Sequence, residues 1–277
     1  MRARRASKVF FTYVTLIAIG IFTIAPFVWM VLVSLHPSKS AIPDIRDLWP
    51  REFHFDNYAT VLFMPDIPVL RFFLNSIVVT ISVVVGQIVI CSMAAYGFAK
   101  LKFRGRDALF ITFLASMMFA GPVTQIPVYL MVRSFGWLDT YAALIVPGIS
   151  SAFNVFLLRQ FFIQIPEELS EAARLDGATD MTIYGRIMMP LSKAAIATAS
   201  AFTFFAVWTD FFWPLLATSS LNMRTLEVGL SIFKDSYGGT NWPLQMTAAV
   251  IVVAPLLVLF LFTQRFFTRG VTLGAIK

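Results

Sequence analysis

Long apolar runs are the feature that most constrains this fold. The runs from Phe10 to Leu35 and from Phe72 to Ala99 both exceed the roughly 20 residues that a helix needs to cross a hydrocarbon core of about 30 Å. Hydrophobic residues make up 58% of the 277-residue chain and charged residues 13%. A globule of this size cannot hide so much apolar surface from water. The sequence therefore predicts an integral membrane protein.

Six apolar runs divide the chain, and each is expected to form one span. The expected spans are residues 10–35, 72–99, 108–131, 141–158, 194–218 and 244–262. Gly121-Pro122 and Pro127 should break or kink the third span, because proline lacks a backbone donor. Such a break is tolerated in a membrane only where protein or a water-filled path satisfies the freed backbone groups. We expect an all-α protein with one transmembrane domain over residues 1–277.

Positive charge predicts the orientation of these spans. With both termini inside, fifteen of the 22 lysines and arginines lie on the inner side, including a basic cluster between Lys100 and Arg106. The segment 166–190 then lies in the cytoplasm, whereas segment 219–243 lies outside. The formal charge of +7 is scattered over the ends of apolar runs, so a nucleic-acid partner is not expected.

The polar segment 166–190 separates the fourth and fifth runs. Pro166 is suited to the first turn of a helix, and Gly177 can supply the left-handed residue that ends it. A helix of roughly ten residues is marginal in water by itself, so it should dock on another surface. Pro190 is expected to end a second helix and to push Met189 out of helical geometry. The segment is predicted to be helix, glycine turn, helix.

The sequence contains few residues that could form a catalytic or metal site. No glycine is followed by lysine, so the phosphate-binding loop of P-loop ATPases is absent and the chain cannot hydrolyse ATP by that route. His36 and His54 are the only histidines, and both lie in one external segment. Cys91, the single cysteine, lies inside an apolar run, so neither a disulfide nor a Cys/His metal site is expected. An enzyme is not predicted.

The segment 166–190 also carries a specific resemblance. Its Glu171-Ala172-Ala173, Asp176-Gly177-Ala178, Ile187 and Pro190 are spaced as in the EAA loop of bacterial ABC importer permeases. Further stretches resemble the carbohydrate-importing branch of that family: Asn75-Ser76, Ala94-Ala95-Tyr96, Phe103-Arg104-Gly105-Arg106, Gly136-Trp137-Leu138-Asp139-Thr140, Trp213-Pro214-Leu215 and Thr225-Leu226-Glu227-Val228-Gly229-Leu230. The subtype that the chain resembles is the smaller permease subunit of maltose-type sugar importers.

The resemblance implies a function and a set of partners. The chain would be a permease subunit in a bacterial inner (plasma) membrane, surrounded by lipid, moving a sugar or related polyol. It would work with a second homologous permease subunit, two copies of a cytoplasmic ABC ATPase and an external substrate-binding protein. ATP and Mg²⁺ would be bound by the ATPase subunits, so this chain would need no cofactor of its own. The external loop 219–243, with Gly238-Gly239, would touch the binding protein.

The resemblance also assigns residue roles in coupling to the ATPase. The implied coupling residues are Glu171, Ala172, Ala173, Asp176, Gly177 and Pro190. Glu171 would offer charge to a basic partner, the alanines would permit close approach, and Gly177 would set the turn between the helices.

Four residues are candidates for the substrate pathway. Asp210 is the only acidic residue within a predicted span, and such residues usually face a cavity or bundle interior. Trp208 and Phe211 could stack on sugar faces, and Gly121 lies at the expected break in the third span. The alternatives are that Asp210 only caps a helix near Trp213-Pro214 and that the aromatic residues anchor the chain at the interface.

A self-sufficient secondary transporter driven by protons or sodium is the alternative function. Such a transporter needs ionisable or cation-coordinating groups near the midplane, often at broken helices. Gly121-Pro122 and Asp210 provide only a weak version of that pattern, and no acidic chain runs through the spans.

The predicted orientation can be tested by cysteine labelling of intact cells. Cysteines placed at Lys102 and Arg174 should be protected from an impermeant reagent, whereas cysteines at Asp139 and Lys234 should react. Labelling of position 174 from outside would contradict the orientation.

Overall fold

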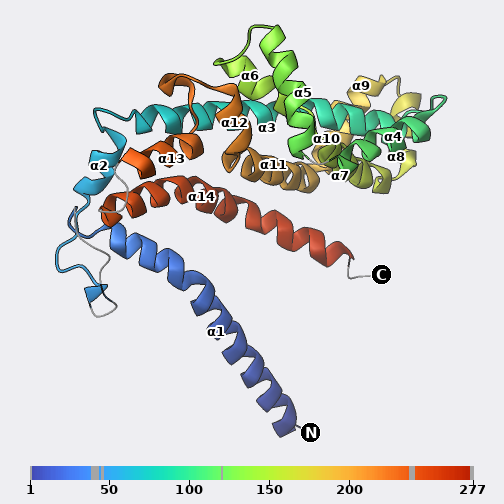
Figure 1. The fold of residues 1–277 in the computed structure, drawn as a ribbon. Coiled ribbons are helices and arrows are strands. Elements are labelled where there is room, and N and C mark those ends of the chain that lie inside the picture. Colours follow the sequence, from blue (N-terminus) through green and yellow to red (C-terminus); the bar gives the residue numbers. More distant parts are fainter. Residues whose placement is uncertain (1, 39–43, 45–46, 120, 237–240, 275–277) are drawn as a thin grey trace. The chain divides into compact units, whose positions relative to one another are not determined.

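The computed structural model describes residues 2–38, 44, 47–119, 121–236 and 241–274 (Figure 1). All regular elements in this part of the chain are helical, which confirms the predicted all-α class. The chain divides into two compact units, one made of residues 1–69 with 230–255 and the other of residues 70–229 with 256–277.

The helices are numbered in chain order, with η marking 3₁₀ or π-helical turns. They are α1 (Arg2–Ser34), α2 (Asp56–Leu62), α3 (Val69–Lys100), α4 (Arg106–Ala115), η2 (Ser116–Met118), α5 (Gly121–Ser134), α6 (Tyr141–Ile145), η3 (Val146–Gly148), α7 (Ala152–Gln164), α8 (Glu167–Leu175), α9 (Asp180–Ile183), η4 (Tyr184–Met188), α10 (Met189–Leu191), α11 (Lys193–Trp208), α12 (Phe212–Ala217), η5 (Leu221–Met223), α13 (Leu226–Ser236) and α14 (Trp242–Gly274).

Three of these helices are long and apolar enough to cross a membrane alone, namely Phe10–Ser34, Val69–Lys100 and Trp242–Gln264. Three bent pairs bring the number of spans to as many as six. The pairs are Arg106–Met118 with Val123–Ser134, bent by 101°, Tyr141–Gly148 with Ala152–Gln164, bent by 41°, and Asp180–Leu191 with Lys193–Trp208, bent by 80°. The expected break in the third run is confirmed, because Phe119 is extended between η2 and α5. Helix α5 nevertheless continues through Pro127.

The fifth apolar run is not one continuous helix. Helix α11 ends at Trp208, and α12 begins only at Phe212. Thr209 and Asp210 lie between the two helices, so the chain changes direction before Trp213-Pro214 and not at it. The prediction of a continuous run over 194–218 overlooked this break, because every residue around it except Asp210 is apolar or weakly polar.

The first unit is held together by polar contacts at the end of α1. Asn57 is buried and donates to the carbonyls of Ser34 and His36, both at 2.8 Å. The hydroxyl of Thr247, on α14, donates to the same Ser34 carbonyl at 3.2 Å. The carbonyls at a helix end lack intrahelical partners, so these side chains supply what the helix cannot.

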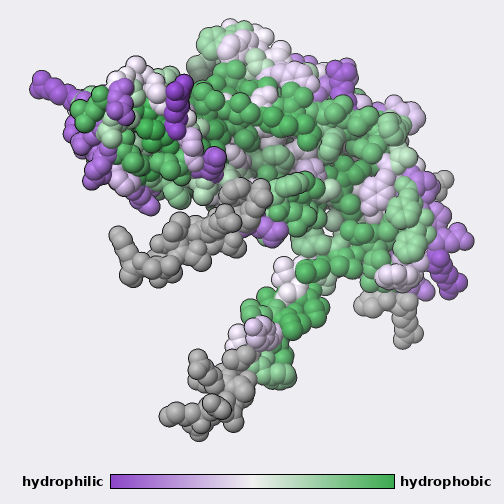
Figure 2. Space-filling model, turned by 180° about the vertical axis from the view of Figure 1, so that it is seen from behind, coloured by the Kyte–Doolittle hydropathy of each residue, from purple (hydrophilic) through white to green (hydrophobic). Residues whose placement is uncertain are grey.

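Helix α3 is the straight scaffold of the second unit, and α7 and α11 lie beside it (Figure 1). Hydrophobic side chains cover the middle of this unit, whereas hydrophilic ones gather at the end that carries α8 and α9 (Figure 2). Two buried apolar clusters lie along α3. One surrounds Val79 and Val83, and the other surrounds Cys91 and Ala95.

Polar side chains on α3 satisfy backbone groups at breaks in other segments. The Gln87 amide donates to the Gly148 carbonyl at 2.6 Å, where η3 interrupts the fourth run. Its oxygen accepts from Asn154 and from Thr203, which join α7 and α11 to the same point. Nearer the start of α3, Asn75 donates to the carbonyls of Asn222 and Arg224 at 2.8 and 2.9 Å. Helix α3 therefore compensates for breaks in the segments around it.

Asp139 closes a tight turn at the expected outer end of this unit. It has a left-handed backbone, with φ of 61°, and its carboxylate accepts from the Ser219 and Ser220 amides at 3.0 Å each. Burial opposes ionisation, but the hydrogen bonds from Ser220 and Ser219 and the charge of Arg224 hold the pKa of Asp139 below its ordinary value. The resulting stabilisation is present above the ordinary pKa and is lost as the pH falls through the lowered one.

Asp139→Val should lower the free energy of unfolding by roughly 2 to 4 kcal/mol. A β-branched residue is strained at positive φ, and both amides lose their acceptor. Asp139→Asn should cost less than about 1 kcal/mol, because asparagine tolerates the left-handed region and keeps one acceptor oxygen. Thermal unfolding of the purified protein measures both variants. Equal midpoints for the two variants would contradict this account of the turn.

Candidate functional site

The segment 166–190 forms the predicted helix, glycine turn and second helix. Helix α8 ends in a Schellman motif, in which the Ala178 amide donates to the Ala173 carbonyl at 2.9 Å and the Gly177 amide donates to the Arg174 carbonyl at 3.0 Å. Gly177 has a φ of +84°, which confirms its predicted left-handed conformation. Thr179 then caps α9 by accepting from the Thr182 amide at 3.3 Å.

The expected end of the second helix at Pro190 is wrong. Met189 has helical backbone angles, with φ of −62° and ψ of −47°, and the helical path continues to Leu191. Residues Tyr184–Met188 form a π-helical turn directly before this point. A π-helical turn is wider than an α-helical one and leaves room for the proline ring, so the chain passes Pro190 without stopping.

The predicted coupling residues do not all lie on one exposed face. Ala173 packs against the apolar cluster around Cys91 and Ala95, together with Ala178, and Ser170 beside it on α8 is fully buried. The other five predicted residues are exposed, and they are Glu171, Ala172, Asp176, Gly177 and Pro190. The expected docking of α8 is thus partly on the chain itself, because Ala173 lies on the opposite side from Glu171.

Side chains of α3 hydrogen-bond to the segment 166–190 and to the residue before it. The buried Lys100 ammonium donates to the Ile165 carbonyl at 2.6 Å, directly before α8. The Ser92 and Tyr184 hydroxyls share a hydrogen bond of 2.7 Å, and Tyr96 donates to Asp180 at 3.4 Å. Three side chains spread over two turns of α3 therefore hold the start of α8, the start of α9 and the π-helical turn that follows α9.

Exposed ion pairs complete the segment. Arg174 lies 3.0 Å from Asp180, and Lys102 lies 3.8 Å from Glu167. The hydrogen bond that Arg174 donates to the Asp180 carboxylate raises the pKa of the Arg174 guanidinium, so this group stays charged. Pairs as exposed as these contribute little stability. Their charges remain available to a partner.

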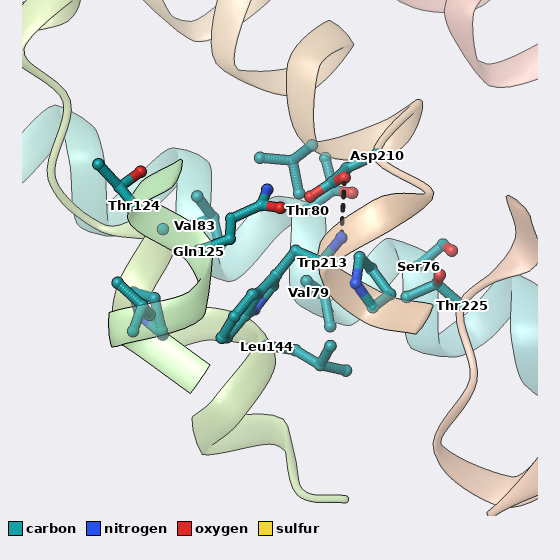
Figure 3. A pocket seen from close by; sticks show the side chains of 15 residues that line it. Ser76, Val79, Thr80, Val83, Thr124, Gln125, Leu144, Asp210, Trp213 and Thr225 are labelled. Carbon is teal, nitrogen blue, oxygen red and sulfur yellow. Dashed lines mark hydrogen bonds between the residues drawn. The ribbon is translucent and has the colours of Figure 1, made fainter. Parts of the chain in front are cut away.

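A cavity of about 260 Å³ lies near the other end of α3. Side chains from α3, α5, α6, η3, α11 and α12 line it, together with Asp210 and Thr225 (Figure 3). The residues that line it are Ser76, Val79, Thr80, Val83, Thr124, Gln125, Val128, Leu144, Pro147, Gly148, Val207, Asp210, Trp213, Pro214 and Thr225.

Several polar atoms of this cavity have no hydrogen-bond partner in the protein. They are the Thr80 hydroxyl, the Gln125 side-chain oxygen and the Thr225 hydroxyl, and each is buried. Asp210 accepts from the Phe212 and Trp213 amides at 3.1 and 3.3 Å, so it caps α12 as well as lining the cavity. Figure 3 shows the Gln125 side chain extending toward Asp210 and Thr80.

Of the four residues expected along a substrate path, Asp210 alone lines this cavity. Trp208 is 2% exposed and packs on Phe73 and Phe204, away from the cavity. Phe211 is partly exposed, and Gly121 lies one helical turn before the lining residues Thr124 and Gln125. Asp210 both caps α12 and lines the cavity, and its part in a substrate path stays a prediction.

The sequence reasoning overlooked the uncharged polar residues of the spans. Thr80, Gln87 and Gln125 were not named as candidates, and Thr225 was named only in a stretch that resembles the permease family. An amide inside an apolar run is costly unless it is paired, so a search for Asn and Gln within spans would have found Gln87, Gln125 and Asn154. The described residues contain no group of histidine, cysteine and acidic side chains that could hold a metal ion.

A family model described as the inner membrane component of binding-protein-dependent transport systems matches residues 1–273. The chain belongs to this family. Its members are components of membrane transport systems and not enzymes, which decides against a self-sufficient secondary transporter.

Two relatives illustrate how broad this family is. The arabinooligosaccharides transport system permease protein AraQ of Bacillus subtilis is 34% identical over 254 residues, covering 91% of this chain and 90% of the relative. The sn-glycerol-3-phosphate transport system permease protein UgpE of Brucella abortus is 32% identical over 262 residues, covering 92% and 93%.

Solved structures agree with the fold. A chain of a bacterial ABC transporter involved in the import of the acidic polysaccharide alginate superimposes with a TM-score of 0.80 at 24% identity, covering 94% of this chain and 98% of that one. A chain from a bacterial alginate ABC transporter in complex with a pentasaccharide-bound periplasmic protein gives a TM-score of 0.65 at 16% identity, covering 96% of each chain. The predicted permease fold is thereby confirmed.

Gly177→Val should disrupt the turn between α8 and α9, because a β-branched residue resists a φ of +84°. Ala173→Leu should displace α8 from its own apolar cluster, at a cost of about 1 to 3 kcal/mol for overpacking. Limited proteolysis in inside-out vesicles measures both effects as faster cleavage between α8 and α9.

Thr179→Ser is the matched control for this experiment, because serine also caps a helix. Its cleavage rate should equal that of the wild type. If Gly177→Val were also cleaved at the wild-type rate, the left-handed turn would not hold the segment together.

Proposed function

We propose that this chain is a permease subunit of an ATP-driven importer for a sugar or related polyol. In this proposal the segment 166–190 lies in the cytoplasm, with both termini, and couples the subunit to a separate ATPase. The importer contains a second homologous permease and two ATPase copies. An external binding protein delivers the substrate.

The surface of the α8–α9 segment is the single observation that carries the coupling role. The Leu175 side chain is 90% exposed at the end of α8, and Met181 on α9 is 61% exposed. Large apolar side chains on a hydrophilic end of a protein are typical of contact sites for another protein. The left-handed turn at Gly177 and the Thr179 cap hold this surface in one shape, which lowers the entropic cost of docking.

Hydrogen bonds from α3 connect this surface to the membrane-spanning part of the chain. Lys100 contacts the start of α8, and Tyr96 contacts the start of α9. A movement of the segment against the ATPase would therefore act on α3, whose other half lines the cavity. ATP binding can drive the permease between inward-facing and outward-facing states only if it favours one arrangement over the other.

A carbohydrate substrate is supported by the relatives. AraQ is named for arabinooligosaccharides, and the structural neighbours are described as alginate importers. UgpE is named for sn-glycerol 3-phosphate, a phosphorylated polyol, so the family name alone does not fix the substrate. The external binding protein would contact the loop 219–243. Of that loop, Gly238-Gly239 lie outside the described residues.

Leu175→Asp should abolish copurification of the ATPase without affecting membrane insertion. Removing a buried leucine from an interface costs about 1.5 to 3 kcal/mol, which is a factor of roughly ten to a hundred and fifty in affinity. Leu221→Asp is the matched control, because Leu221 is 43% exposed but lies in η5 within the expected external loop. ATPase retained by Leu175→Asp at the control level would contradict the proposed coupling surface.

A further inference from the structure

The cavity beside Asp210 offers hydrogen bonds that the protein does not use. The side chains of Thr80 and Thr225 are 1% and 6% exposed, and both line the cavity with unpartnered hydroxyls. The Gln125 oxygen is buried there without a partner as well. Buried polar groups normally have partners, so a set of three around one cavity indicates a ligand with several hydroxyl groups.

The charge of the lining restricts that ligand further. Among the described residues, Asp210 is the one charged side chain that lines the cavity. Arg224, the neighbour of Thr225, does not belong to the lining, and its charge acts on Asp139. A carboxylate with no basic side chain beside it repels an anion and accepts hydrogen bonds from neutral hydroxyls.

The size and the apolar part of the lining fit a single ring. Sites for drug-sized ligands measure roughly 300 to 1,000 Å³, so a cavity of about 260 Å³ suits a ligand unit of about one ring. Val79, Val83 and Leu144 together with Trp213 provide apolar surface next to the polar groups. Such a mixture matches a sugar ring, which has C–H faces and a hydroxyl rim.

We propose that this cavity is a subsite, within this subunit alone, for one neutral sugar or polyol unit, and that it discriminates against acidic sugars and phosphorylated polyols. Thr80, Gln125, Thr225 and Asp210 bind the hydroxyl groups. The proposal rests on the proposed function, and it separates this chain from relatives named for an anionic substrate. Asp210 acts in the subsite as a hydrogen-bond acceptor and as the group that repels anions.

A reporter cysteine on the cavity wall tests the subsite. Thr124 lines the cavity with an exposed side chain, and the single native cysteine, Cys91, is buried. Thr124→Cys is therefore labelled with neutral N-ethylmaleimide in membranes that contain the whole importer. The probes are a mixture of neutral aldoses (glucose, galactose, xylose and arabinose) and a mixture of glucuronate and galacturonate.

The neutral aldoses should slow labelling at least fivefold, and the uronates should change it by less than twofold. Adding Asp210→Asn to the reporter should allow the uronates to slow labelling, because the repelling charge is gone. Protection by neither mixture, or equal protection by both in the Asp210 form, would overturn the proposal.

Two further variants locate the binding groups. Thr80→Val and Gln125→Leu, each in the reporter background, should raise the aldose concentration for half-protection by roughly two- to tenfold, the effect of one hydrogen bond. Thr198→Val is the matched control, since Thr198 lies on α11 outside the lining and donates to the Ala194 carbonyl. Wild-type half-protection in both test variants would overturn the assignment of these groups.

Copurification of the ATPase from the same membranes shows whether the subsite or the proposed function is wrong. If the ATPase copurifies but the aldoses give no protection, the subsite alone is wrong. If the ATPase is absent from the purified wild-type chain, the proposed function is wrong, whatever the labelling shows.

Discussion

A backbone carbonyl freed by a helix break inside a membrane has no water to bond, and this chain meets that constraint with side chains from one helix. The Gln87 amide bonds the Gly148 carbonyl where the fourth run is interrupted, and Lys100 bonds the Ile165 carbonyl directly after α7 ends. Asn75 likewise bonds the Asn222 and Arg224 carbonyls, in the segment that follows α12. Helix α3 is continuous from Val69 to Lys100, whereas the runs packed beside it are broken.

The same arrangement connects the two sites. Thr80 lies on the cavity side of α3, and Lys100, twenty positions later, bonds the Ile165 carbonyl directly before the segment 166–190. Between them, Gln87 joins α7 and α11 to the scaffold through Asn154 and Thr203. These hydrogen bonds join the three helices at one buried point, so we expect the helices to move together during transport. The cavity and the segment 166–190 therefore contact opposite halves of α3.

Short sequence patterns predicted most of the segment 166–190 but not the cavity. The conformation of Gly177 was predictable because a Schellman motif at the end of a helix needs a left-handed residue, and glycine adopts that conformation most readily. Pro190 was misjudged because the rule that proline stops a helix takes no account of the π-helical turn before it. Gln125 and Thr80 could not be assigned to a cavity from sequence, since only the packing of α3 against α5 and α12 decides which polar groups share a space.

The central claim is that the α8–α9 surface contacts an ATPase, and site-specific photocrosslinking tests it most directly. A photoreactive amino acid replaces Leu175 in the intact importer, and mass spectrometry identifies the adduct. The account predicts one dominant adduct with a cytoplasmic ATPase that carries a phosphate-binding loop. The same probe at Leu221 should give none with that protein. Adducts only with lipid, or the same ATPase adduct from both positions, would contradict the account.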